Sequence, residues 1–136
     1  AAYTRELLHL ATVTTPNLHE AQALTGLSST DPELLARTIH DRHGCAAIVT
    51  GGHGSQAGDT LCDDAGVTVI PGVRLPRAST HGAGCTHSAT LAAHLASGAD
   101  LREAAHAAKR AATGAVAHGR PFGAGAGPVD VMGGVA

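Results

Sequence analysis

The sequence predicts an α/β fold with a mostly parallel sheet flanked by helices, and three observations support that prediction. First, short runs of β-branched and aliphatic residues alternate with longer runs whose apolar residues recur at helical spacing. Second, residues that favour helix starts, such as Asp31 followed by Pro32, precede the helical runs, and glycines follow them. Third, a glycine-rich turn over residues 82–84 leads directly into an alanine-rich helical run, an arrangement suited to holding a ligand.

The order of the expected elements follows from these local signals. Two strand-like runs at 59–62 and 67–73 flank a turn at 63–66, so we expect a hairpin and an antiparallel edge on the sheet. In chain order the expected elements are the end of a helix at 3–10, a strand at 11–14, helices at 18–25 and 32–43, a strand at 45–50, the two hairpin strands, a helix from the glycine turn to Gly98, and a helix at 101–118. Residues 119–136 are rich in glycine and proline and predict a loop or a partly disordered tail.

The composition argues against several classes of function. A formal net charge of -2 and an aromatic content of 1% provide neither a basic surface nor stacking side chains for nucleic acid. No apolar run is long enough to cross a membrane, and no signal segment opens the chain. Three cysteines without metal-finger spacing favour a reduced, cytoplasmic compartment, and the ten scattered histidines do not indicate a metal site.

The strongest candidate for chemistry is the turn formed by Gly82, Ala83 and Gly84 together with Cys85. Glycine lets the backbone turn sharply and approach a ligand closely. The first N–H groups of the following helix have no partner inside it and lie at the positive end of its dipole, so they can hold phosphate oxygens. The same environment favours a thiolate at Cys85 that accepts a proton from an alcohol. The alternative is a plain tight turn with Cys85 as a small buried apolar residue.

A second candidate is the pair Asn17 and Glu20, which stand three residues apart at a helix start. This spacing is typical of a capping box, in which the two side chains satisfy the first N–H groups of the helix. The functional alternative is that the carboxylate lies over the carboxyl edge of the sheet, where open α/β sheets bind ligands, and holds Mg²⁺ beside phosphates. The sequence leaves both interpretations open.

A third candidate follows the buried strand at 45–50. Gly51 and Gly52 come directly after Thr50, at the carboxyl end of that strand. They indicate either a simple turn or a place where the backbone comes close to a nucleotide.

Four segments of the chain occur in an order that is characteristic of one family. They are residues 15–21 (Thr-Pro-Asn-Leu-His-Glu-Ala), 51–53 (Gly-Gly-His), 80–89 (Thr-His-Gly-Ala-Gly-Cys-Thr-His-Ser-Ala) and 125–129 (Gly-Ala-Gly-Pro-Val). Together they resemble the C-terminal part of a hydroxymethylpyrimidine/phosphomethylpyrimidine kinase, the thiamine-biosynthesis member of the ribokinase-like superfamily. The resemblance implies a ribokinase-like fold, use of ATP and Mg²⁺, and phosphorylation of 4-amino-5-hydroxymethyl-2-methylpyrimidine and then of its monophosphate.

The resemblance also implies roles for individual residues. Cys85 matches the catalytic base, and Gly82, Ala83 and Gly84 match the anion hole. Asn17 and Glu20 match a motif tied to phosphate and Mg²⁺, with Glu20 on the metal side. Thr50, Gly51 and Gly52 match the nucleotide side.

Two residues depart from the family pattern. Thr50 stands where the family usually has lysine, so a positive charge near the phosphates is missing. Ala83 stands where threonine is common, which is a milder change.

The resemblance begins in the middle of the family pattern. We therefore expect residues 1–118 to be the C-terminal part of a ribokinase-like kinase domain that lacks its N-terminal strands, followed by the tail at 119–136. A sheet without those strands exposes an unpaired edge, so we expect this chain alone to be poorly stable or inactive.

Two rivals to the pyrimidine kinase remain. One is a pyridoxine or pyridoxal kinase of the same fold, and the other is a truncated, non-catalytic nucleotide-binding fragment. The resemblance further implies that the full-length family forms homodimers.

Overall fold

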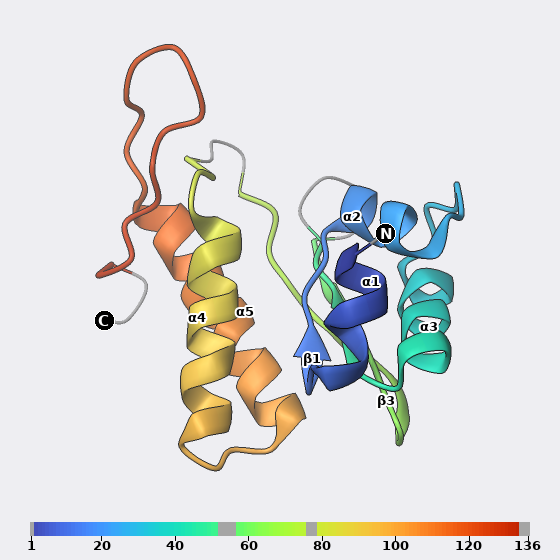
Figure 1. Cartoon of the computed structure of the whole chain (residues 1–136). Coiled ribbons are helices and arrows are strands. Elements are labelled where there is room, and N and C mark those ends of the chain that lie inside the picture. The colour runs from blue at the N-terminus through green and yellow to red at the C-terminus, as the bar shows by residue number, and fades with distance from the viewer. Residues whose placement is uncertain (1, 52–56, 76–78, 134–136) are drawn as a thin grey trace. The chain divides into compact units, whose positions relative to one another are not determined.

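The computed structural model of the chain describes residues 2–51, 57–75 and 79–133 (Figure 1). The chain divides into two compact units, Ala1–Pro71 and Gly72–Ala136. The first unit contains the sheet and the second a pair of long helices.

The first unit is built on a four-stranded sheet whose strand order follows the chain, β1-β2-β3-β4. The strands are β1 (Val13–Thr14), β2 (Ala46–Val49), β3 (Asp59–Asp63) and β4 (Gly66–Ile70). β1 pairs with β2 in parallel, whereas the pairs β2–β3 and β3–β4 are antiparallel. The α/β class is confirmed, but the sheet is mixed rather than mostly parallel, because two of the three pairings among the described strands, β2–β3 and β3–β4, are antiparallel.

The hairpin forms as the turn signals predict. Asp63 faces Gly66 across the turn, and the Asp63 carboxylate accepts a hydrogen bond of 2.9 Å from the N–H of Ala65. The second hairpin strand is shorter than expected and ends at Ile70. Pro71 follows, and because proline has no N–H it cannot extend the strand pairing.

Short helical segments precede β1, as the sequence predicts. An α-helix, α1 (Ala2–Glu6), is followed by a 3₁₀ turn, η1 (Leu8–Leu10). Leu8 is fully buried and belongs to the core of this unit.

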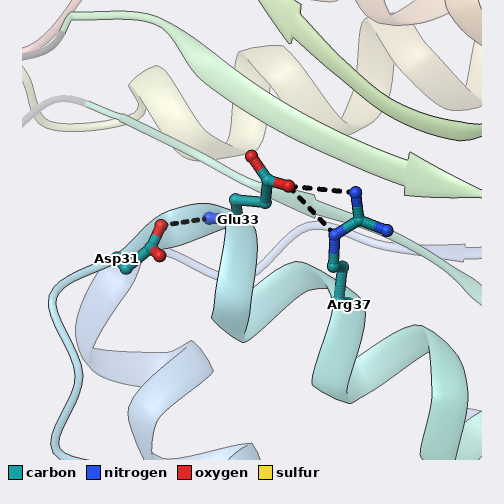
Figure 2. A network of polar contacts seen from close by, with 3 residues as sticks. All are labelled: Asp31, Glu33 and Arg37. Carbon is teal, nitrogen blue, oxygen red and sulfur yellow. Dashed lines mark hydrogen bonds and ion pairs between the residues drawn. The ribbon is translucent and has the colours of Figure 1, made fainter.

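Two helices connect β1 to β2, and local capping sets their ends. α2 (Leu18–Thr25) and α3 (Pro32–His43) each end at a glycine with a left-handed backbone. Figure 2 shows the start of α3, where Asp31 accepts a bond from the N–H of Glu33, and the Glu33 carboxylate pairs with Arg37 one turn later. The cap at Asp31 with Pro32 and the glycine ends are the start and stop signals expected from the sequence, and the ion pair between Glu33 and Arg37 adds to them.

The core of the first unit lies between α3 and the sheet, because α3 packs against β2 and β3. Leu35 and Ile39 of α3 are fully buried there. The buried members of this cluster are Leu8, Ala21, Leu35, Ala36, Ile39, Cys45, Ala47, Val49 and Cys62. Burial raises the pKa of the Cys45 and Cys62 thiols, so both behave as neutral packing groups rather than as nucleophiles.

The second unit consists of α4 (Ala83–Ala96) and α5 (Leu101–His118), which pack side by side (Figure 1). Asp100 caps α5 by accepting a hydrogen bond of 2.8 Å from the N–H of Glu103. The buried face of α5 is made of alanines, which allow close approach of the neighbouring helix: Ala104, Ala105, Ala107, Ala108 and Ala115. None of the helices in the described part of the chain has the length and apolar character needed to cross a membrane.

The segment after α5 is irregular, and hydrogen bonds hold it to the rest of the second unit. The N–H of His81 donates to Gly127 at 3.2 Å, and the N–H of Val129 donates back to His81 at 3.0 Å. Further along, the N–H of Asp130 donates to Ala115 at 2.9 Å. Residues 119–133 thus form the predicted loop, and this loop pairs with the residues just before the glycine turn.

Candidate functional site

The glycine turn is the start of helix α4. Gly82 is the N-cap residue, with φ of 96° and ψ of -2°, a left-handed conformation that favours glycine. The helix begins at Ala83, and the first bond of the regular helical pattern runs from the N–H of Thr86 to Gly82 at 2.9 Å. The N–H groups of Gly84 and Cys85 therefore precede the helical ladder, and no residue in the described part of the chain accepts a hydrogen bond from them.

Cys85 lies in the first turn of α4 and is exposed, in contrast to the buried Cys45 and Cys62. Its thiol does not belong to an apolar interior, so the interpretation of Cys85 as a small buried residue is wrong. The structure thus combines an accessible sulfur atom with unpartnered amides at the positive end of a helix dipole.

Two contacts hold the turn in shape. The hydroxyl of Thr86 donates to the carbonyl of Gly82 at 2.9 Å. A Cβ added at Gly82 would lie 3.3 Å from Cγ2 of Val129, which is in the irregular segment that pairs with His81. Glycine suits this position because of its left-handed backbone angle, and an added Cβ would also press on the side chain of Val129.

We expect Gly82→Ala to lower the free energy of unfolding by about 1–2 kcal/mol, because an L residue is strained in the left-handed region. Gly84→Ala is the matched control: its backbone is helical, and an added Cβ would meet no atom within 4 Å. We expect that variant to keep its stability or gain somewhat, since alanine favours helices. Urea unfolding of both variants checks the contrast, and equal losses would contradict this account of the turn.

Asn17 and Glu20 form a complete capping box at the start of α2. The N–H of Glu20 donates to the Asn17 side chain at 2.9 Å, and the N–H of Asn17 donates to the Glu20 carboxylate at 2.8 Å. The structural interpretation of this pair is confirmed. Glu20 remains exposed, and its second carboxylate oxygen is not part of the box.

A single exposed carboxylate can hold Mg²⁺ only together with other ligands. Mg²⁺ is usually bound by one or two carboxylates together with substrate phosphates and waters. Glu20 fits that pattern, and the described residues contain no cluster of three or more metal-binding side chains. The role of Glu20 toward Mg²⁺ remains a prediction.

Exchanging Glu20 for glutamine separates its two roles. Glutamine preserves the capping box but removes the charge, so Glu20→Gln should melt like the parent and show weaker Mg²⁺-dependent ATP binding. Asn17→Ala should cost about 0.5–2 kcal/mol of stability, whereas Asn17→Ser should retain the cap. Thermal melting and calorimetric titration with ATP, with and without Mg²⁺, check both. Unchanged Mg²⁺ dependence in Glu20→Gln would leave Glu20 with the capping role alone.

Thr50 and Gly51 follow β2 and are tied to the start of α2. The N–H of Thr50 donates to Pro16 at 2.9 Å, its hydroxyl lies 3.4 Å from the same carbonyl, and Thr50 forms a parallel bridge with Asn17. The N–H of Gly51 donates to the carboxylate of Asp59 at 2.9 Å. Gly52 lies outside the described residues.

Within the first unit, the structure therefore brings together Asn17, Thr50 and Gly51. Glu20 lies in the first turn of α2, the helix that Asn17 caps. The second unit holds Gly82, Ala83, Gly84 and Cys85 as one continuous turn. Sequence reasoning treated Asp59 only as part of a strand. The local signal that could identify it is an acidic residue at the first position of a strand.

Comparisons with known proteins identify the family of this chain. The sequence profile described as phosphomethylpyrimidine kinase matches residues 1–130. The hydroxymethylpyrimidine/phosphomethylpyrimidine kinase of Streptomyces coelicolor is 40% identical over 128 residues, which cover 91% of this chain and 48% of that protein. The corresponding kinase of Haemophilus influenzae is 37% identical over 140 residues, covering 96% and 52%. The chain thus spans about half the length of these curated relatives.

Solved structures share the fold, and two similar ones are pyridoxal kinases. Bacillus subtilis pyridoxal kinase, solved as an ADP complex, superposes with a TM-score of 0.88 at 37% identity and covers 97% of this chain and 52% of its own. Staphylococcus aureus pyridoxal kinase, solved with AMP-PCP, has a TM-score of 0.87 at 34% identity, covering 96% and 50%. With the sequence profile matching almost the whole chain, this polypeptide belongs to the phosphomethylpyrimidine kinase family.

Proposed function

We propose that this chain supplies the phosphoryl-transfer site of a kinase that uses ATP and Mg²⁺ to phosphorylate 4-amino-5-hydroxymethyl-2-methylpyrimidine and its monophosphate, in thiamine diphosphate biosynthesis. The observation that supports it most directly is the start of α4, where one helical turn holds an exposed cysteine and amides that find no acceptor among the described residues. The names of the similar curated proteins agree with this substrate class. The proposed location is the cytoplasm, and the proposed assembly is a homodimer of the complete protein.

In the first of these two reactions, the hydroxyl oxygen of the pyrimidine alcohol attacks the γ-phosphorus of ATP. A new oxygen–phosphorus bond forms, the bond between the γ-phosphorus and the β-γ bridging oxygen breaks, and ADP leaves. The substrate hydroxyl proton passes to Sγ of Cys85, which acts as the general base. The N–H groups of Gly84 and Cys85 stabilise the charge on the transferring phosphoryl group, as positioned donors do in phosphoryl-transfer enzymes.

The first unit would serve the nucleotide and the metal. Thr50, Gly51 and Gly52 are proposed to face the nucleotide, with Asn17 near its phosphates. When bound, Mg²⁺ neutralises charge on the phosphate oxygens, and the exposed carboxylate of Glu20 is the group that would hold it. Thr50 carries no positive charge here, and its hydroxyl is directed to Pro16, so it contributes backbone geometry rather than charge.

A second candidate is a pyridoxine or pyridoxal kinase. It is favoured by the similarity to solved pyridoxal kinases with TM-scores of 0.87 and 0.88. Steady-state assays of a complete enzyme that contains this chain, with the pyrimidine alcohol and pyridoxal as competing substrates, distinguish the two. A kcat/KM that favours the pyrimidine by tenfold or more supports the first proposal, and the reverse order supports the second.

A non-catalytic nucleotide-binding role is the remaining alternative. It predicts ATP binding in calorimetry without turnover of either alcohol. Turnover that depends on Cys85 rules it out, whereas the absence of both binding and turnover would remove the kinase proposal altogether.

A further inference from the structure

Asp59 is a buried carboxylate that the proposed chemistry does not use. It opens β3, its side chain has no exposure to solvent, and its Oδ1 accepts a hydrogen bond of 2.9 Å from the N–H of Gly51. Burying a carboxylate is costly unless hydrogen bonds compensate it, and bonds from backbone N–H groups to a carboxylate are among the stronger ones in proteins. The side chain is thus placed where its bond to Gly51 shapes the backbone after β2.

Neighbouring residues hold Asp59 in this place. It pairs in register with Ile70 of β4, which is itself buried. Gly58, the preceding residue, lies so close to this strand that an added Cβ would be 2.7 Å from the carbonyl oxygen of Ile70. Only a residue without a side chain fits there. The close approach of Gly58 to β4 thus fixes the position at which β3 begins and places Asp59 beside Gly51.

The bond to Gly51 is part of a connected set at the end of β2. Next to Gly51, the N–H of Thr50 donates to Pro16, and Thr50 bridges to Asn17 at the start of α2. The backbone just after β2 is therefore held by two hydrogen bonds, one from Gly51 to Asp59 and one from Thr50 to Pro16.

We propose that Asp59 is a positioning residue for ATP: its carboxylate fixes the backbone at Gly51 and so sets the affinity for the nucleotide without touching it. This inference rests on the proposed function, because it assigns Gly51 to the nucleotide side. It goes beyond that function by assigning a role to Asp59, a buried residue of β3 that holds the backbone at Gly51 by a hydrogen bond.

The test compares Asp59→Ala with Asp59→Asn in a complete enzyme that contains this chain. The asparagine carbonyl retains an acceptor for Gly51, whereas alanine removes it. We expect Asp59→Ala to raise the Kd and KM for ATP roughly tenfold with kcat changed much less. We expect Asp59→Asn to keep the ATP affinity within about threefold of the parent, since its carbonyl still accepts the bond from Gly51.

Asp63→Ala is the matched control. Asp63 lies at the other end of β3, and its carboxylate also accepts a bond of 2.9 Å from a backbone N–H, that of Ala65. Its removal should leave the Kd for ATP unchanged. An equal loss of affinity in Asp63→Ala would reduce the effect to a general weakening of β3 and overturn the proposal.

Hydrogen exchange of the Gly51 amide separates this inference from the proposed function. Protection in the parent that is lost in Asp59→Ala, together with weaker ATP binding, supports the proposal. A Gly51 amide that exchanges freely in the parent overturns the inference while leaving the kinase function intact. This measurement uses the parent enzyme alone, so it does not depend on whether a variant folds. Loss of protection with unchanged ATP affinity also overturns it, and a parent that does not bind ATP removes both the inference and the function.

Discussion

Replacing Cys85 by alanine in a complete kinase that contains this chain is expected to lower kcat for the pyrimidine alcohol by about 10²–10⁴-fold, the usual contribution of a positioned general base. The thiol is exposed in the first turn of α4, next to amides that have no acceptor in the described part of the chain. Without the sulfur atom, the substrate proton has no acceptor at that position, whereas the amides that hold the phosphoryl group remain. The KM for ATP should therefore change little.

Two controls make the measurement specific. Cys85→Ser preserves the size of the side chain but supplies a poorer base, so it should fall in kcat almost as far as Cys85→Ala. His94→Ala changes an exposed side chain on the same helix and should leave kcat unchanged. Steady-state kinetics with matched melting temperatures check the series, and a Cys85→Ala enzyme within a few-fold of the parent would remove Cys85 from the role of base.

The second large effect is expected in the core of the first unit. Leu35→Ala should lower the free energy of unfolding by about 2–5 kcal/mol, because it removes a fully buried side chain between α3 and the sheet and leaves a cavity. Leu34→Ala, one residue earlier on α3, changes a side chain that is 45% exposed and should cost less than about 1 kcal/mol.

Chemical denaturation of both leucine variants, with the parent measured alongside, reads out this difference as a shift of the midpoint. A similar small loss at both positions would mean that α3 does not present Leu35 to the core. A large loss at Leu34 would instead indicate that the exposed side of α3 is covered by further protein.

The local features of the fold were predictable because each depends on few neighbouring residues. The capping box at Asn17 and Glu20 and the left-handed glycine stops at Gly26 and Gly44 involve contacts within one helical turn. The hairpin turn at 63–66 is equally local. β4 ends three residues earlier than predicted, because Pro71 has no N–H to continue the strand pairing.

The exposure of Cys85 could not be read from the sequence. A cysteine after a glycine turn is compatible with a buried or an exposed thiol, and the choice depends on which face of α4 packs against α5. The pairing of residues 127–129 with His81 is likewise a long-range contact. It connects segments more than 40 residues apart, which no local pattern specifies.

By itself, the sequence determined the helices and their caps, the hairpin, and the candidate turn at Gly82–Cys85, because propensity, capping and glycine conformation act over a few residues. Only the tertiary structure decided that β2 pairs antiparallel with the hairpin, that the Cys85 sulfur is accessible, and that Asp59 bonds to Gly51. Those three outcomes depend on the pairing and packing of residues distant in the chain, where the free energy of burial and hydrogen bonding selects one arrangement among several that are locally acceptable.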